Sequence, residues 1–382
     1  MNSCPTKTPR RRLRPSDLGG IVLLESKERG PVHWLAQRGG VRELLCVPAA
    51  LFGCVARLRA GLYERRLLSV QEVGVPVVSI GNITAGGTGK TPMVALVVRT
   101  LIAQGYQPAI LSRGYGSSPG VPNDEALELA RLLPKTEHVQ EPRRVAGAAR
   151  LVDRGADVIV MDDGFQHRHL ARNLDLVLID ATRPMGLPRP QKGGEAVQAF
   201  LPRGLMREDF HALKRADFLL ITRADQVPPQ ELEELELKLA AQAGGIPVAL
   251  ARHRPEQVWT PDGGRPVETL AGLEVDLISA IGNPEAFERT LLDLGAKVCE
   301  HRIFEDHHDY SAKDLEGLGE RPLLTTMKDG VKLESVGGPQ PWIVEVSLEI
   351  YRGVERLEEL LSTLPKPTAA ARRASLRGGL VG

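Results

Sequence analysis

The chain has 382 residues, a formal net charge of +1 at pH 7 and a hydrophobic content of 42%. This length allows about two domains of ordinary size, and the hydrophobic content is sufficient for a sizeable core. The near-neutral charge and the 4% aromatic content argue against a nucleic-acid-binding protein. The four cysteines lack C-x-x-C spacing, so they indicate free thiols in a reducing compartment.

Two segments precede the first predicted strand. Residues 1–40 are rich in basic side chains and contain no apolar stretch of signal-peptide length, so we expect a disordered basic region. Residues 41–70 are predicted to form an amphipathic helix, because apolar residues recur at helical spacing: Leu44, Val47, Leu51, Val55, Leu58 and Leu62. The uncharged run 44–56 is shorter than the about 20 residues that span a bilayer. The residues alone fit equally a helix at a membrane surface and a helix packed on its own domain.

A glycine-rich loop follows the apolar run 75–80 and precedes a predicted helix over 92–104. The order of strand, glycine-rich loop, Lys-Thr and helix is typical of a phosphate-binding loop (P-loop). We expect its backbone to surround nucleotide phosphates, with Lys90 reaching the β- and γ-phosphates and Thr91 binding Mg²⁺. The predicted phosphate-binding residues are Thr84, Ala85, Gly86, Gly87, Thr88, Gly89, Lys90 and Thr91. The strict pattern has glycine where Thr84 stands, and the alternative is a glycine-rich turn without a ligand.

Short apolar runs alternate with helical segments from residue 71 to 252. The predicted strands are 75–80, 108–111, 157–161, 174–179, 218–221 and 247–251, and the predicted helices after 92–104 are 125–133, 144–154 and 230–242. This alternation predicts an α/β fold with a doubly wound, mostly parallel, P-loop NTPase-like sheet. A segment rich in proline and glycine, 252–266, predicts a boundary before a second, smaller α/β domain over 253–364. Residues 365–382 are expected to be a disordered basic tail.

Two adjacent carboxylates, Asp162 and Asp163, end the predicted strand 157–161. Carboxylates at the tip of a buried strand are costly unless they meet a cation or a hydrogen-bond donor. Beside a P-loop, the simplest role for them is to hold Mg²⁺ against the nucleotide phosphates. Capping of a turn explains one of the two residues but not both.

The sequence Thr222-Arg223-Ala224-Asp225 resembles the guanine-reading loop of GTPases, which makes a GTPase switch the main competing class. Arginine replaces the usual lysine of that loop, and Asp163-Gly164 does not fit the usual switch spacing. The candidates for a catalytic base are Asp124 and His307. Each also has an ordinary interpretation, since Asp124 could cap the following helix and His307 could lie at the surface.

Several blocks together resemble the tetraacyldisaccharide 4'-kinases, the lipid A 4'-kinases of lipopolysaccharide synthesis. The matching stretches are GNITAGGTGKTP (81–92), SRGYG (112–116), NDEALELARLLP (123–134), DDGFQHRHLARNLDLVLID (162–180), LPRGLMRE (201–208), RADFLLITRAD (215–225), AIGNPEAF (280–287) and FEDHHDY (304–310). They follow the order of the family and cover roughly residues 45 to 345. A threonine at position 84 is normal for this family.

The resemblance implies an enzyme that transfers the γ-phosphate of ATP, with Mg²⁺, to the 4'-hydroxyl of a tetraacyldisaccharide 1-phosphate. Asp124 matches the family's catalytic acidic residue and His307 the histidine that pairs with it, although His308 is one residue away. Lys90 keeps its catalytic role at the phosphates, and the metal residues are Thr91, Asp162 and Asp163. Residues implied in substrate or phosphate contacts are Arg144, Gln166, His167 and Arg207. The family usually has G-D-E-P around the aspartate, where this chain has Asn-Asp-Glu-Ala.

The resemblance also favours the membrane-surface interpretation of residues 41–70, because acyl chains of the substrate stay in the bilayer. It implies a peripheral protein on the cytoplasmic face of the bacterial inner membrane, with a lipid substrate, no nucleic-acid partner and no obligate protein partner. Two other functions stay open on the residues alone. One is a P-loop kinase or ligase acting on a soluble metabolite, and the other is the GTPase switch.

Overall fold

The structure is a computed structural model that describes residues 31–114, 122–190 and 194–366. The expected C-terminal tail and most of the expected N-terminal basic region lie outside these residues. Part of the N-terminal region is helical, because α1 spans Pro31–Ala36 and its Ala36 side chain is buried beside Leu187 and Val197. The expectation of a disordered region up to residue 40 is therefore wrong for residues 31–36. Three apolar residues of α1 pack against the protein: Val32, Leu35 and Ala36. The sequence prediction overlooked them because the region as a whole is basic.

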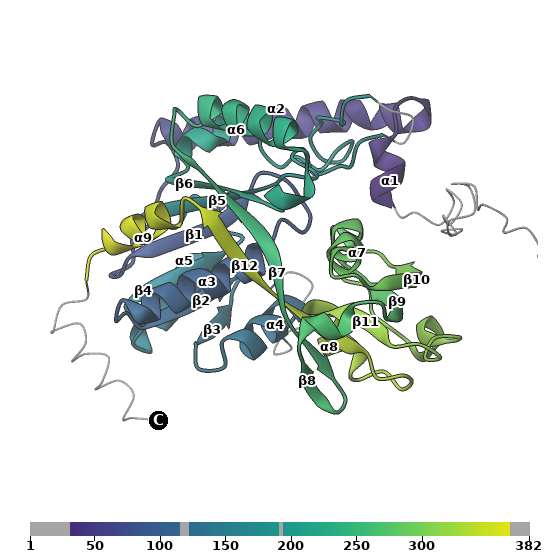
Figure 1. Cartoon of the computed structure of the whole chain (residues 1–382). Helices are drawn as coiled ribbons and strands as arrows, with labels where there is room; N and C mark the ends of the chain where they lie inside the picture. The colour runs from purple at the N-terminus through teal and green to yellow at the C-terminus, as the bar shows by residue number, and fades with distance from the viewer. Residues whose placement is uncertain (1–30, 115–121, 191–193, 367–382) are drawn as a thin grey trace, which may run out of the picture.

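Within the described residues, a sheet of 12 strands extends from one end of the structure to the other (Figure 1). Its order is β10-β9-β11-β12-β7-β6-β5-β1-β4-β2-β3, with β8 paired to β7. The strands are β1 (Val77–Asn82), β2 (Pro108–Ser112), β3 (His138–Gln140), β4 (Val158–Asp162), β5 (Leu174–Asp180), β6 (Phe218–Thr222), β7 (Val248–Thr260), β8 (Gly263–Arg265), β9 (Glu274–Ser279), β10 (Lys297–Ile303), β11 (Leu323–Thr326) and β12 (Trp342–Arg352). All neighbours pair in parallel except β7 with β12 and with β8. This agrees with the predicted mostly parallel α/β fold.

Helices connect the parallel strands and cover the sheet. They are α2 (Cys46–Glu64), α3 (Lys90–Ala103), α4 (Asp124–Leu132), α5 (Arg144–Asp153), α6 (Pro229–Gln242), α7 (Pro284–Asp293), α8 (Met327–Leu333) and α9 (Val354–Ser362). The predicted helices over 92–104, 125–133, 144–154 and 230–242 begin and end within two residues of α3, α4, α5 and α6. Predicted strands in the same region start within two residues of those observed, because their buried apolar runs are continuous.

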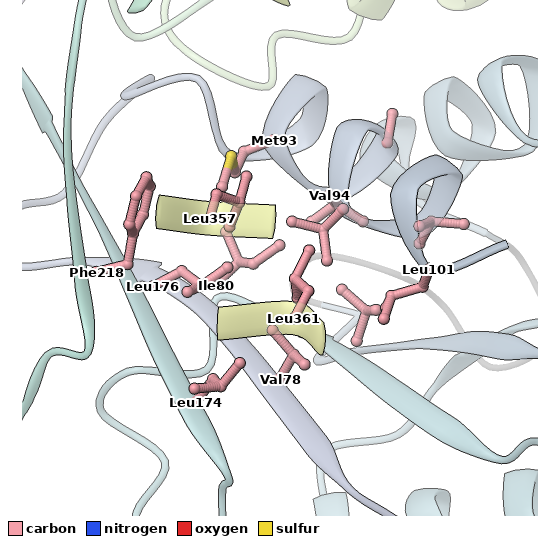
Figure 2. Close-up of a cluster of buried hydrophobic side chains, with 14 of the residues drawn as sticks. Val78, Ile80, Met93, Val94, Leu101, Leu174, Leu176, Phe218, Leu357 and Leu361 are labelled. Atoms are coloured by element: carbon pink, nitrogen blue, oxygen red, sulfur yellow. The ribbon is translucent and has the colours of Figure 1, made fainter. Parts of the chain in front are cut away.

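The main core lies between the sheet and helices α3 and α9 (Figure 2). Val78 and Ile80 of β1 and Leu176 of β5 pack against Met93 of α3 and Leu361 of α9, and all five side chains are fully buried. Burial of one such side chain contributes about 1.5–3 kcal/mol. This packing fixes the end of β1 and the start of α3, and therefore the P-loop between them.

The segment 252–266 is not a loop, contrary to the expected boundary. Strand β7 runs through it to Thr260 and forms a long antiparallel ribbon with β12, which crosses the molecule in Figure 1. Pro255 is accommodated because it pairs at an irregularity of the ribbon, between Glu345 and Val346. The expected division at residue 252 thus falls inside a strand, and the two domains remain a prediction.

Helix α2 lies along one edge of the molecule and continues a 3-10 helix over Gly40–Leu45 (Figure 1). The combined helix Gly40–Glu64 has 25 residues and contains an 18-residue window with a mean hydropathy of 1.5, so by length and composition it could cross a membrane. The uncharged run 44–56 is one part of this helix, which also includes the charged residues Arg57 and Arg59. One face of α2 is nevertheless attached to the protein, because Gly53 packs against Phe200 and Arg57 pairs with Asp209.

Candidate functional site

The carboxyl ends of the central parallel strands open into one cavity of about 1070 Å³. Its walls come from the P-loop, the segment after β4, and helices α2, α4 and α7. The P-loop residues from Ala85 to Thr91 line this cavity. Thr84 is not among the described residues that line it, since Thr84 is buried and its backbone pairs with Met206. The first of the eight predicted phosphate-binding residues therefore anchors the loop to a neighbouring segment.

The P-loop backbone is shaped by two glycines and held by three hydroxyl or amide groups. Gly86 and Gly89 have φ of +111° and +89°, a region in which a side chain would be strained. The Thr88 hydroxyl accepts a 2.8 Å hydrogen bond from the Asn82 amide, and the Thr222 hydroxyl donates to the Thr88 carbonyl at 3.0 Å. Gly89 lies just before α3, so the positive N-terminal end of this helix faces the cavity.

The two adjacent carboxylates have different surroundings. The Arg207 guanidinium donates 2.8 Å hydrogen bonds to both carboxylate oxygens of Asp163. The Lys90 ammonium lies 3.6 Å from Oδ1 of the same carboxylate. Burial alone would raise the pKa of Asp163, but these two positive charges outweigh it and lower the pKa to about 2. Burial, together with the nearby negative charge of Glu125, raises the pKa of Asp162 to about 7.

The residues around Asp162 fit a divalent cation. Its Oδ1 is buried and has no hydrogen-bond partner among the described residues, although the residue lines the cavity. A buried carboxylate oxygen without a donor is costly unless a cation binds it. Thr91 lines the same cavity, and hydroxyl, carboxylate and phosphate oxygens are the ligands that Mg²⁺ prefers. Mg²⁺ retains waters and substrate phosphates, so it does not require a complete set of protein ligands.

A second acid–base group lies where α4 meets the loop after β10. Nδ1 of His307 is 3.1 and 3.0 Å from the two carboxylate oxygens of Asp124. The hydrogen bond to Asp124 raises the pKa of His307. His307 has φ of +68°, a strained conformation that turns its ring toward α4. His308 instead lies 3.3 Å from Asp314, so His307 is the histidine that contacts Asp124, and its role in the reaction stays a prediction.

His307 lines the cavity, but Asp124 is not among the described residues that do so. The Asp124 side chain is only 5% exposed and lies behind the imidazole. Asn123, not Asp124, caps α4, because its side chain accepts the hydrogen bond from the backbone N–H of Ala126. The capping interpretation of Asp124 is therefore wrong, and its carboxylate is directed toward the histidine.

Helix α8 adds two lysines that the sequence analysis missed. Lys332 lies 3.0 Å from Oδ2 of Asp124, and Lys328 lies 3.7 Å from the same oxygen and 2.7 Å from Asp306. Burial opposes ionisation of Asp124, but His307, Lys328 and Lys332 outweigh it and hold the pKa of that carboxyl well below its usual range. Their spacing places both lysines on one face of the helix, because positions four apart share a face. No pattern in the sequence indicates that this face meets Asp124.

The remaining predicted contact residues all line the cavity. Arg144 is buried and donates to the carbonyl oxygens of Asp162 and Glu141 at 3.2 and 3.3 Å, which fixes the end of β4. Gln166 donates to the carbonyl of Asn82 at 2.8 Å. Burial, together with the positive charge of Arg144, lowers the pKa of His167 to about 4, so this histidine is neutral at pH 7.

The P-loop packs against the residues directly before α7. The Cα of Gly282 lies against the backbone of Gly87, and Asn283 donates a 2.9 Å hydrogen bond to Asp180. Arg223 joins the same group, because it donates to Asp180 at 2.6 Å and to the Gly87 carbonyl at 3.0 Å. Arg223 therefore anchors the P-loop. This contact explains the arginine of the Thr222–Asp225 motif without a guanine-reading role.

Comparisons with known proteins identify the family. The family described as LpxK, tetraacyldisaccharide-1-P 4'-kinase, matches residues 41–365. A tetraacyldisaccharide 4'-kinase of Anaeromyxobacter sp. (strain Fw109-5) is 39% identical over 345 residues, which cover 83% of this chain and 90% of the relative. A tetraacyldisaccharide 4'-kinase of Geobacter sulfurreducens is 36% identical, with 76% of this chain and 84% of the relative covered.

A solved structure agrees with these relatives. The structure of LpxK from Aquifex aeolicus, described as an "apo" form in complex with ATP, superposes with a TM-score of 0.65 and 28% sequence identity. The match covers 85% of this chain and 99% of that one. The predicted fold and the predicted family are therefore confirmed. The chain belongs to the tetraacyldisaccharide 4'-kinase family.

Proposed function

We propose that this chain transfers the γ-phosphate of ATP to the 4'-hydroxyl of a tetraacyldisaccharide 1-phosphate in lipid A biosynthesis, with Mg²⁺ bound beside the phosphates. The family to which the chain belongs supports this reaction. One observation on this chain supports phosphoryl transfer directly. The P-loop and the Asp124–His307 pair lie on one cavity, so a phosphoryl donor and a hydroxyl acceptor can meet there. A GTPase switch would not need such an acceptor group, and a kinase of a soluble metabolite would not need the exposed apolar face of α2 beside the cavity.

The donor half of the proposed site is the P-loop. The backbone N–H groups of the loop and the N-terminal end of α3 would hold the phosphates of ATP. Lys90 would leave Asp163, to which its ammonium lies at 3.6 Å, and neutralise the β- and γ-phosphates. Arg207 keeps Asp163 paired when Lys90 moves, because it contacts both oxygens of that carboxylate.

Asp162 and Thr91 would hold Mg²⁺, and Asp163 would support it from the shell around the ion. The ion, when bound, would neutralise charge that develops on the transferring phosphoryl group. The unpartnered Oδ1 of Asp162 supports this assignment. Removal of divalent cations with a chelator should abolish transfer, and Mg²⁺ should restore it. A chain that transfers phosphate at full rate in excess chelator would contradict the metal assignment.

The acceptor half of the proposed site is the Asp124–His307 pair. Because His307 lines the cavity and Asp124 lies behind it, we assign the pair as one unit that removes the proton of the 4'-hydroxyl. Nε2 of His307 would take the proton while Nδ1 stays hydrogen-bonded to Asp124, and Asp124 would stabilise the resulting imidazolium. General base catalysis of this kind contributes about 10²–10⁴-fold to a rate.

We also propose that α2 attaches the protein to the cytoplasmic face of the inner membrane. Its outer face is apolar and exposed, with Val47, Leu51 and Leu58 each at least 66% exposed. An exposed apolar stripe of this size is unusual on a soluble monomer and suits the boundary between head groups and acyl chains. The adjoining face of α2 lines the catalytic cavity, so the same helix would bring the lipid substrate to the phosphate donor.

The test of the reaction is transfer of labelled γ-phosphate from ATP to tetraacyldisaccharide 1-phosphate in detergent micelles. The Asp124→Asn variant should lose about 10²–10⁴-fold in turnover while ATP binding stays within a factor of two. Equal loss of ATP binding would mean that Asp124 supports the fold and not the proton transfer. Competition between GTP and ATP in one binding assay should favour ATP, and a preference for GTP would support a switch.

A further inference from the structure

One end of the cavity is formed by helix α2 and the segment that follows Asp163. The residues of α2 that line it share one helical face and are Phe52, Val55, Ala56, Arg59 and Ala60. Arg168, from the opposite segment, lines the same end. This end is therefore apolar at Phe52 and Val55 and cationic one turn further along the helix. None of the roles proposed above uses either arginine.

The two arginines are held in place without a carboxylate partner. Arg59 donates to the carbonyl of Gln166 at 3.0 Å, and Arg168 donates to the carbonyl of Ala60 at 3.2 Å. Both guanidinium groups stack on the ring of Tyr63, at 5.2 and 5.0 Å from its centroid. Neither forms an ion pair with an acidic side chain among residues 31–114, 122–190 and 194–366.

Three neighbouring arginines differ from Arg59 and Arg168 because they form ion pairs. Arg57, Arg172 and Arg215 each pair with a carboxylate, at 2.9, 3.0 and 2.8 Å. Burial lowers the pKa of Arg168, and the positive charges of Arg215 and Arg172 lower it further. The negative charges of Glu64 and Glu208 act on Arg168 in the opposite direction, but among the described residues neither forms an ion pair with Arg168 or Arg59. Two cations without an ion-pair partner in one corner of a cavity repel each other, so the corner binds an anion favourably.

We propose that Arg59 and Arg168 bind the phosphate that the acceptor lipid carries on its sugar away from the reacting hydroxyl. This inference rests on the proposed function. A sugar phosphate monoester carries a charge of about −1.5 to −2 at neutral pH and accepts paired hydrogen bonds from guanidinium groups. Its acyl chains would lie against Phe52 and Val55, which are 39% and 57% exposed and adjoin the outer apolar face of α2. The order of apolar and cationic residues along α2 thus matches an amphiphile with an anionic head.

The experiment compares two acceptors in uncharged detergent micelles: tetraacyldisaccharide 1-phosphate and the same lipid without its phosphate. The Arg59→Gln and Arg168→Gln variants should each lower kcat/KM for the phosphorylated acceptor by roughly 10–100-fold. Both should leave kcat/KM for the acceptor without phosphate within a factor of two. The Arg59→Lys variant keeps the charge and should recover part of the preference. The Arg65→Gln variant is the control, because Arg65 is exposed at the end of the same helix.

Three results would overturn the inference. Equal losses for the two acceptors would mean that the arginines support packing and not phosphate recognition. If the wild-type chain uses both acceptors equally well, the phosphate of the acceptor does not contribute to recognition. That result would refute the phosphate site and leave the proposed function intact. If the variants keep the preference but lose binding to anionic phospholipid vesicles without acceptor, the anion is a membrane head group. Failure of the wild-type chain to phosphorylate either lipid would instead refute the proposed function, and the inference with it.

Discussion

Gly282→Ala tests whether the residues that begin α7 set the position of the P-loop. A Cβ at this position would overlap the backbone nitrogen of Gly87 and lie 3.0 Å from the carbonyl carbon of Gly86. Both contacts are with backbone, which cannot rotate away as a side chain can. Relief of the overlap therefore requires the P-loop and the start of α7 to separate by on the order of 1 Å.

The cost of this separation follows from two effects. Overpacking of a closely packed contact costs about 1–3 kcal/mol of stability. Displacement of a phosphate-holding loop by about 1 Å lowers a rate by up to roughly 10²-fold. We expect Gly282→Ala to weaken ATP binding and to lower turnover together, because the same loop holds the nucleotide and aligns its γ-phosphate.

The assay pairs ATP affinity by calorimetry with label transfer to the lipid acceptor, after thermal unfolding shows that the variant is folded. Gly337→Ala is the matched control, because a Cβ there would meet no atom within 4 Å and Gly337 has an ordinary φ. A Gly282→Ala protein with wild-type ATP affinity and turnover would refute the reasoning. Such a result would mean that the start of α7 rests on the P-loop without positioning it.

Three further predictions concern the acid–base pair and the membrane helix. Lys332→Met removes the positive charge 3.0 Å from Asp124 and should raise the pKa of that carboxyl in a carbon NMR titration, whereas Lys332→Arg should not. The pKa of His307 should lie above its usual value of 6.5. The pairing of His307 with Asp124 therefore stabilises the fold fully below pH 6.5, and this stabilisation is lost as pH rises through the raised pKa. The Asp124→Asn variant should return the pKa of His307 to 6.5 or below. Leu51→Glu should reduce vesicle flotation while micellar activity is retained, and unchanged flotation would contradict membrane attachment through α2.

The donor half of the site could be predicted from the sequence because its chemistry is local. The strand, the glycines and Lys90-Thr91 are consecutive, and Asp162 directly follows a continuous apolar strand. Parallel strands bring such ends to one edge, so spacing along the chain was sufficient. The Asp124–His307 pair joins residues 183 positions apart, and only the family resemblance placed the two together.

Other parts of the site gave no readable local pattern. Lys328 and Lys332 contact Asp124 because α8 packs on α4, a long-range contact that no periodicity indicates. Residues 252–260 of the β7–β12 ribbon were interpreted as part of a linker, since the exposed side chains of β7 give it the composition of a loop. Arg223 resembled part of a nucleotide-reading motif, but its contact with Asp180 depends on two strand ends meeting in the fold.

Transfer of labelled γ-phosphate from ATP to tetraacyldisaccharide 1-phosphate tests the central claim most directly. The wild-type chain in micelles with Mg²⁺ should yield a lipid phosphorylated at the 4'-position, and Asp124→Asn should lower that yield while ATP still binds. A folded wild-type chain that binds ATP but transfers no label to this lipid would contradict the account.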